Sequence, residues 1–151
     1  MRGSFLFLGS GASLGVPVIG CSCSICQSHS PYNHRLRPSG LITIDNKTFL
    51  IDAGPDLRTQ ALKYHLKHLD GLLLTHTHFD HVAGLDDLRP YSFFEKKALP
   101  CLLSKESFDQ LKICYHYLMH PLEGEITSTK HFQFHLFQVL KNPFICLLMM
   151  P

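Results

Sequence analysis

The 151-residue sequence contains no apolar run of the length that a membrane span requires, about 18 residues. The apolar run at residues 4–8 is too short for a secretory signal, and the glycines of residues 9–15 interrupt it. We therefore expect a cytoplasmic protein with no membrane partner.

The sequence also lacks an excess of charge of either sign. Fourteen Lys and Arg residues against twelve Asp and Glu residues give a net charge of only +2, so nucleic acid is not an expected partner. Hydrophobic residues make up 45% and charged residues 17%, a composition typical of globular proteins. A chain of this length favours one domain over residues 1–151.

Two nucleotide-binding fingerprints are absent. Gly9, Gly11 and Gly15 are separated by one and then three residues, which does not match G-x-G-x-x-G, and no Gly-Lys-Ser/Thr follows. We therefore predict that residues 9–17 form a tight active-site loop and not a nucleotide cradle.

Hydrophobic patterns predict strands that alternate with helices. The expected strands are a buried one at 4–8, a hairpin of 41–45 and 48–52 around Asn46-Lys47, then 69–74, 99–103 and 132–136. Three helices are expected. The first begins after Asp56, which can cap it, the second covers 82–88 and ends before Pro90, and the third begins after Ser104, which can cap it. This order predicts an α/β layered domain with a mixed sheet.

Histidine is abundant, with 11 residues, and its densest group follows the predicted strand 69–74. His76 and His78 are one residue apart, so in an extended segment both side chains project to the same side and can bind one cation. Asp80 and His81 follow at a turn, where they can bind a second cation. Such a pair of sites is typical of two-metal hydrolases.

Two further residue groups are candidates for structural or metal-site roles. Cys21, Cys23 and Cys26 can supply three corners of a tetrahedral zinc site, and His29, His34 or a more distant residue could supply the fourth. The remaining cysteines, Cys101, Cys114 and Cys146, lie in apolar patterns and are expected in the core. Asp52 ends a predicted strand, where a turn role and a metal-supporting role are both open and compatible.

The pattern His76-x-His78-x-Asp80-His81, with Asp52 at the end of an earlier strand, resembles the metallo-β-lactamase superfamily. The resemblance implies the N-terminal part of an αββα sandwich with mixed sheets. It also implies that His76 and His78 bind one divalent metal, that Asp80 and His81 bind a second, and that Asp52 supports the ligands. Zinc and manganese both suit these ligands.

The Gly/Ser-rich residues 8–17, followed by Cys21-x-Cys23-x-x-Cys26, resemble the branch that contains the phosphoribosyl cyclic phosphate phosphodiesterase. That resemblance implies a structural zinc on the three cysteines and a distant histidine. It also implies hydrolysis of a small or cyclic phosphodiester by metal-bound hydroxide, which Asp80 would orient while Asp52 supports the site. The alternatives are a ribonuclease of the transfer-RNA 3′-processing type and a non-catalytic zinc-binding remnant, and a homodimer is compatible with each.

The superfamily pattern also requires a later His, a bridging Asp and a final His, and we find no such set. The nearest candidate is His135, which the alternating pattern of its strand places toward solvent, and His116 and His120 are expected to be structural or exposed. The apolar run 144–150 continues almost to the last residue. We therefore expect a chain shortened at its C-terminus that holds about the first half of the domain.

Overall fold

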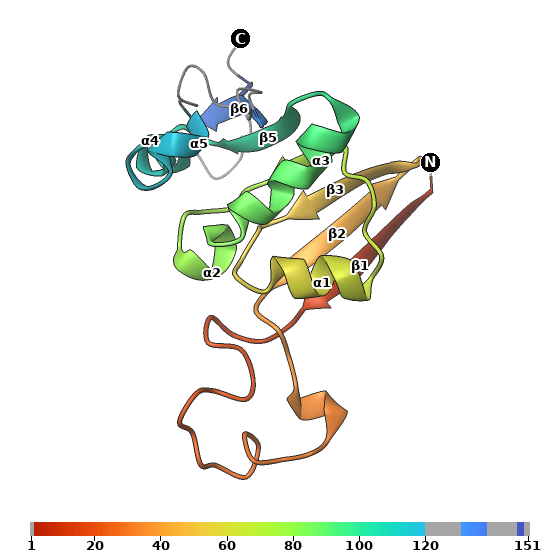
Figure 1. Cartoon of the computed structure of the whole chain (residues 1–151), viewed down its shortest axis with the longest axis vertical. Helices are drawn as coiled ribbons and strands as arrows, with labels where there is room; N and C mark the ends of the chain where they lie inside the picture. The colour runs from red at the N-terminus through yellow and green to blue at the C-terminus, as the bar shows by residue number, and fades with distance from the viewer. Residues whose placement is uncertain (1, 120–130, 139–147, 150–151) are drawn as a thin grey trace.

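A computed structural model describes residues 2–119, 131–138 and 148–149 (Figure 1). Seven strands form one sheet in chain order. Their bounds are β1 (Gly3–Gly9), β2 (Ser39–Ile44), β3 (Lys47–Ile51), β4 (Gly71–Leu73), β5 (Leu99–Ser104), β6 (Phe132–Gln138) and β7 (Leu148–Met149).

The sheet is mixed, as the sequence predicts. Strands β1 to β3 are antiparallel, β3 to β6 run parallel, and β7 returns antiparallel to β6. Parallel neighbours end at the same edge of the sheet, so the residues that follow β3 and β4 lie close together. The hydrogen bond from the Asp52 N–H to the Leu73 carbonyl, 3.0 Å long, joins these two ends.

The helical segments connect the strands. They are η1 (Pro31–Asn33), α1 (Leu57–Lys63), α2 (Phe79–Val82), η2 (Leu85–Leu88), α3 (Arg89–Glu95), α4 (Lys105–Cys114) and α5 (His116–Met119). Ser104 caps α4 as predicted, because its hydroxyl accepts the Ser107 N–H at 3.1 Å. The helix expected at 82–88 is found in part as η2, which ends at Leu88 before Pro90. Pro90 itself lies in the first turn of α3, which was not expected and where a missing N–H costs no hydrogen bond.

Among the described residues, only one face of the sheet is buried, and the helices cover it (Figure 1). The cross-strand row Leu50, Leu72 and Cys101 lies on this face, and each residue is at most 1% exposed. On the opposite face, Phe5 is 50% and Phe7 68% exposed. The prediction of a buried strand at 4–8 is therefore right about the strand and wrong about its burial, since β1 is an edge strand of which only Leu8 reaches the core.

Two smaller expectations need correction. The β2–β3 turn is centred one residue earlier than expected, on Asp45 and Asn46, which both have the positive φ typical of tight hairpins. Cys101 is buried as predicted, and burial raises the pKa of its thiol to about 12, but Cys114 is exposed. His131 is buried beside β6, with its Nδ1 2.8 Å from the Ser92 hydroxyl. Cys146 and His120 lie outside the described residues.

The residues between β1 and β2 form a long loop that extends away from the sheet (Figure 1). A bridge between Val16 and Arg35 closes its base, with hydrogen bonds of 2.8 Å in both directions. The cysteine cluster Cys21, Cys23 and Cys26 lies in the outer part of this loop. Within the described ranges, no helix combines the length and the apolar character needed to cross a membrane.

Candidate metal centre

The histidine cluster, defined here as His76, His78, Asp80 and His81, lies where β4 leads into α2. Residues 74–78 join β4 to α2, His78 is extended at the start of the helix, and Asp80 and His81 then lie on α2 itself. The ring centres of His76 and His78 are 4.6 Å apart, and those of His76 and His81 are 4.0 Å apart. The structure therefore brings the predicted residues together.

Asp52 is the buried residue around which this cluster is arranged. One carboxylate oxygen accepts the Thr75 N–H at 2.8 Å. The other accepts the Thr75 hydroxyl at 2.8 Å and lies 2.7 Å from His81 Nδ1. A single carboxylate at the end of β3 thus holds the end of β4 and one side chain of α2.

These contacts determine which ring nitrogen of His81 carries the proton. A carboxylate can only accept, so His81 Nδ1 is the donor and, in the neutral ring, Nε2 presents a lone pair. That nitrogen lies 3.3 Å from the Asp80 carboxylate, which is also an acceptor. Two acceptors at this distance need a cation or a proton between them, so the donor set fits a divalent metal.

The same reasoning applies to His76 through Thr75. The Thr75 hydroxyl has one proton, which it donates to Asp52, and its oxygen lies 3.0 Å from His76 Nδ1. His76 Nδ1 is therefore the donor in this pair, and Nε2 is left free to bind a metal. Burial and the neighbouring His81 and His78 rings lower the pKa of His76, which favours the neutral, ligand-competent ring.

Close backbone packing holds α2 against the end of β3. The Ala53 N–H donates to the His81 carbonyl at 2.7 Å, and the Gly84 N–H donates to the Ala53 carbonyl at 2.8 Å. A Cβ atom at Gly54 would overlap the backbone oxygen of Asp80, and one at Gly84 would overlap that of Gly54. Glycine is needed at both positions because of this close approach.

Helix α4 contacts the histidine segment from its other side. The Thr77 side chain lies between the two histidines in sequence and hydrogen-bonds Gln110 of α4. Sequence reasoning missed Gln110, Thr75 and the two glycines, because each contact joins residues that are far apart along the chain. The one local signal was the position of Thr75 directly before His76.

The cysteine cluster is a second candidate metal site. Within the described segments, Cys21, Cys23 and Cys26 form the only group whose three ligand atoms lie within 4.8 Å of one another. The histidine cluster is more widely spaced, so no three of its ligand atoms meet that distance. No described histidine or carboxylate joins the thiols as a fourth ligand, and His34 Nε2 instead lies 3.2 Å from the Ser28 carbonyl.

Local hydrogen bonds give the thiols different acidities. The Cys26 N–H, 3.5 Å from the Cys23 sulfur, and the Cys21 thiol lower the pKa of Cys23 to about 7. The Val18 N–H, 3.3 Å from the Cys26 sulfur, lowers the pKa of Cys26, but desolvation and the other two thiols outweigh it and raise the pKa overall. A cluster with one acidic thiol suits a thiophilic cation such as zinc.

Comparisons with known proteins identify the family and the fold. The family model described as the beta-lactamase superfamily domain matches residues 47–139. A crystal structure of a diphosphatase from the PhnP family is 41% identical, with a TM-score of 0.75, over 83% of this chain and 52% of that one. Zinc-bound PqqB from Methylobacterium extorquens is 22% identical, with a TM-score of 0.71, over 91% of this chain and 46% of that one, which shows a shared fold.

A curated relative from Porphyromonas gingivalis, named octanoyltransferase, is 44% identical over 122 residues. The match covers 79% of this chain but only 24% of the relative. The chain therefore spans between a quarter and about half the length of the proteins it matches. A name given to a protein of which the match covers only 24% does not assign its activity to this segment.

Replacing Thr75 by valine removes the hydroxyl that links Asp52 to His76 and preserves the side-chain shape. We expect zinc affinity at the histidine cluster to fall roughly 10- to 100-fold, as for other residues that orient metal ligands. Competition with a chromophoric chelator, in a chain that also carries Cys23→Ser, measures this site alone. Thr75→Ser keeps the hydroxyl and should restore the affinity; equal affinities for the valine and serine variants would contradict the role of the hydroxyl.

Replacing Gly54 by alanine should force α2 away from the end of β3, because the new methyl group overlaps the Asp80 backbone. We expect a loss of about 1–3 kcal/mol in the free energy of unfolding, measured by denaturant titration. Gly3→Ala is the matched control, since its methyl group would lie 3.5 Å from the Thr43 carbonyl in ordinary contact. A loss of similar size in both variants would refute the close approach.

Proposed function

This chain belongs to the metallo-β-lactamase superfamily, and from that premise we propose that it acts in a metal-dependent hydrolase that cleaves a small or cyclic phosphodiester. The observation that carries the proposal is the facing pair of His81 Nε2 and the Asp80 carboxylate, 3.3 Å apart. Because the Asp52 carboxylate accepts a hydrogen bond from the Nδ1–H of the same ring, Nε2 presents its lone pair and the pair has the chemistry of a metal site.

We assign His76 and His78 to one divalent metal and Asp80 and His81 to a second. The metals supply Lewis acidity and an activated water when they are bound. The chain's own residues hold the ligands in place: Asp52 fixes the protonated nitrogen of His81 directly and that of His76 through Thr75. Asp80, buried on the first turn of α2, is also placed to orient the attacking nucleophile.

The phosphodiester class is supported by the 41% identity to a diphosphatase of the PhnP family. Diphosphates and phosphodiesters both react at a phosphorus atom whose oxygens carry negative charge, and such oxygens suit a pair of hard cations. Histidine and carboxylate ligands bind zinc and manganese alike, so we keep both metals in the proposal.

A second candidate function, a zinc-binding unit without turnover, is favoured by the cysteine cluster. Its three thiols lie within 4.8 Å of one another, whereas the histidine cluster is more widely spaced. The thiols would hold one structural zinc that keeps the β1–β2 loop compact, whether or not the histidine cluster binds metals.

The two candidates differ in metal content and turnover. We expect the whole chain, loaded with zinc or manganese, to hydrolyse bis(4-nitrophenyl) phosphate or ADP, and we expect His78→Ala to abolish this activity and to remove the metals of the histidine cluster. His116→Ala is the matched control, because His116 is exposed on α5 and outside both clusters. Cys23→Ser should remove one zinc equivalent, and Cys114→Ser should remove none.

If neither metal supports hydrolysis and one zinc is lost in Cys23→Ser, the proposal of a hydrolase is wrong and the zinc-binding unit takes its place. Retention of every metal in both His78→Ala and Cys23→Ser would overturn both assignments. Metal content by plasma emission spectrometry and product release by absorbance distinguish these outcomes.

A further inference from the structure

The cysteine cluster also has the arrangement of a site that an oxidant can close. Its three sulfur atoms lie within 4.8 Å of one another. Cys21 and Cys23 are exposed and Cys26 is partly buried, so a small oxidant reaches the cluster from solvent. Exposed thiols that lie beside a second thiol are the ones that oxidants convert to disulfides.

One turn of the loop holds Cys23 and Cys26 together. The Gln27 N–H donates to the Cys23 carbonyl at 3.0 Å, and the Cys26 N–H lies 3.5 Å from the Cys23 sulfur. An N–H group that faces a sulfur favours the thiolate, which is the form that reacts with oxidants. The two residues also have the C-x-x-C spacing that is found in disulfide-exchanging proteins.

The base of the loop separates this turn from the sheet. Val16 and Arg35 are joined by two backbone hydrogen bonds of 2.8 Å, which close the loop on the side of the sheet. The cysteines lie beyond that bridge, in the part of the loop that extends away from β1 and β2 (Figure 1). Side chains there can therefore rotate to bring two sulfurs to bonding distance without any change in the core.

We propose that the cysteine cluster is a site of oxidation by hydrogen peroxide, at which Cys23 and Cys26 form a disulfide. The Cys23 thiolate attacks one peroxide oxygen, so that a sulfur–oxygen bond forms, the oxygen–oxygen bond breaks and hydroxide leaves. The Cys26 thiolate then attacks the Cys23 sulfur and displaces its hydroxyl group. With the two thiol protons, both leaving groups become water: the thiols lose two electrons and one peroxide gains them.

The disulfide and a bound zinc exclude each other. A disulfide takes away two of the three thiolates and leaves Cys21 as the one ligand of the cluster, which is too few to hold zinc. The loss of zinc rests on the assignment of a zinc to the cysteine cluster. The disulfide itself does not, because it forms in the metal-free chain.

The test treats the whole metal-free chain with one equivalent of hydrogen peroxide and then alkylates the remaining thiols with iodoacetamide. Trypsin releases residues 3–35 as one peptide with all three cysteines, because no Lys or Arg lies between Arg2 and Arg35. By mass spectrometry, we expect this peptide to carry one alkyl group after oxidation and three after reduction with dithiothreitol.

Variants identify the reacting sulfurs. Cys23→Ser should slow formation of the disulfide by about tenfold or more, because it removes the thiolate that peroxide attacks. Cys114→Ser is the matched control, since Cys114 is exposed but lies on α4 outside the cluster, and it should leave the rate unchanged. Dimedone, which labels sulfenic acids, should label Cys23 in the Cys21→Ser/Cys26→Ser chain.

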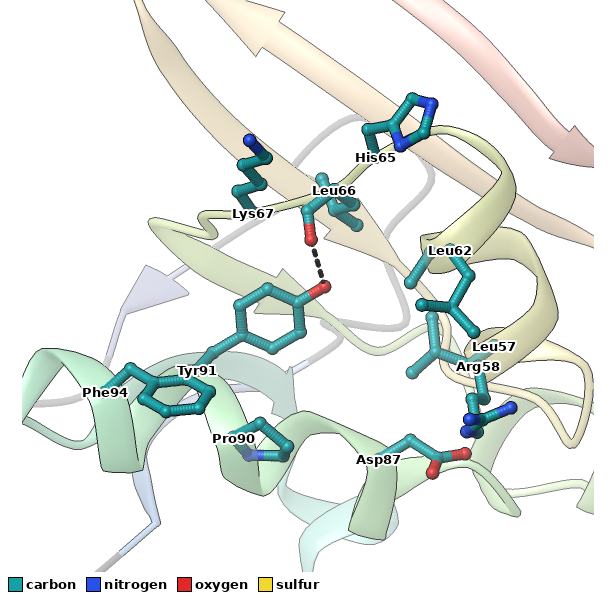
Figure 2. Close-up of a pocket in the computed structure, with 11 residues that line it drawn as sticks. Leu57, Arg58, Leu62, His65, Leu66, Lys67, Asp87, Pro90, Tyr91 and Phe94 are labelled. Atoms are coloured by element: carbon teal, nitrogen blue, oxygen red, sulfur yellow. Dashed lines mark hydrogen bonds between the residues drawn. The ribbon is translucent and has the colours of Figure 1, made fainter.

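The helical layer provides a control for unfolding. Figure 2 shows a groove between α1 and α3, where the Tyr91 hydroxyl donates to the Leu66 carbonyl at 2.8 Å. None of the described residues that line this groove is a cysteine. The NMR signals of Leu57, Leu66 and Tyr91 should therefore stay in place when the disulfide forms, and a general change in them would show unfolding instead of a local reaction.

Two results would overturn the proposal. The first is oxidation of Cys114 as fast as that of Cys23, which would show that the cluster has no special reactivity. The second is a disulfide between two chains in place of one within residues 3–35. In the zinc-loaded chain, a chromophoric chelator should detect zinc release at the rate of disulfide formation. Zinc that stays bound after the disulfide has formed would refute the exclusion and the zinc assignment, and would leave the disulfide itself intact.

Discussion

The carboxylate of Asp52 is the contact on which the metal centre depends. It lies after β3, accepts two hydrogen bonds from Thr75 after β4, and accepts a third from His81 on α2. Three segments from different parts of the chain therefore meet on one side chain that is 5% exposed. The network fixes both the backbone path of the histidine segment and the ring nitrogens that face a metal, so position and protonation have one physical cause.

The sequence predicts those features that local patterns determine. Alternation of apolar residues located β6, the cap at Ser104 located α4, and the spacing of His76 and His78 placed both rings on one side of the chain. Long-range packing determines the rest. Helix α3 was missed because proline is compatible with both a helix start and a helix stop, and the burial of β1 could not be foreseen because periodicity does not say which face of a sheet will be covered.

The uncovered sheet face adjoins the metal centre. The cross-strand row Ile51, Leu73, Leu102 and His135 lies on this face, and Leu73 is two residues before Thr75. A second layer packed on this face would border the histidine cluster. The chain spans 52% of the diphosphatase structure that it matches. His135 is exposed, as the alternating pattern predicts.

The central claim is that Asp52 orients His76 and His81 so that each ring presents Nε2 to a metal. The most direct measurement is a two-dimensional ¹H–¹⁵N NMR spectrum of the histidine side chains in the metal-free protein, at a pH where the rings are neutral. The account predicts the Nδ1–H tautomer for both rings, and for His81 the loss of that preference in Asp52→Ala. An Nε2–H tautomer for His81 in the wild-type protein would contradict it.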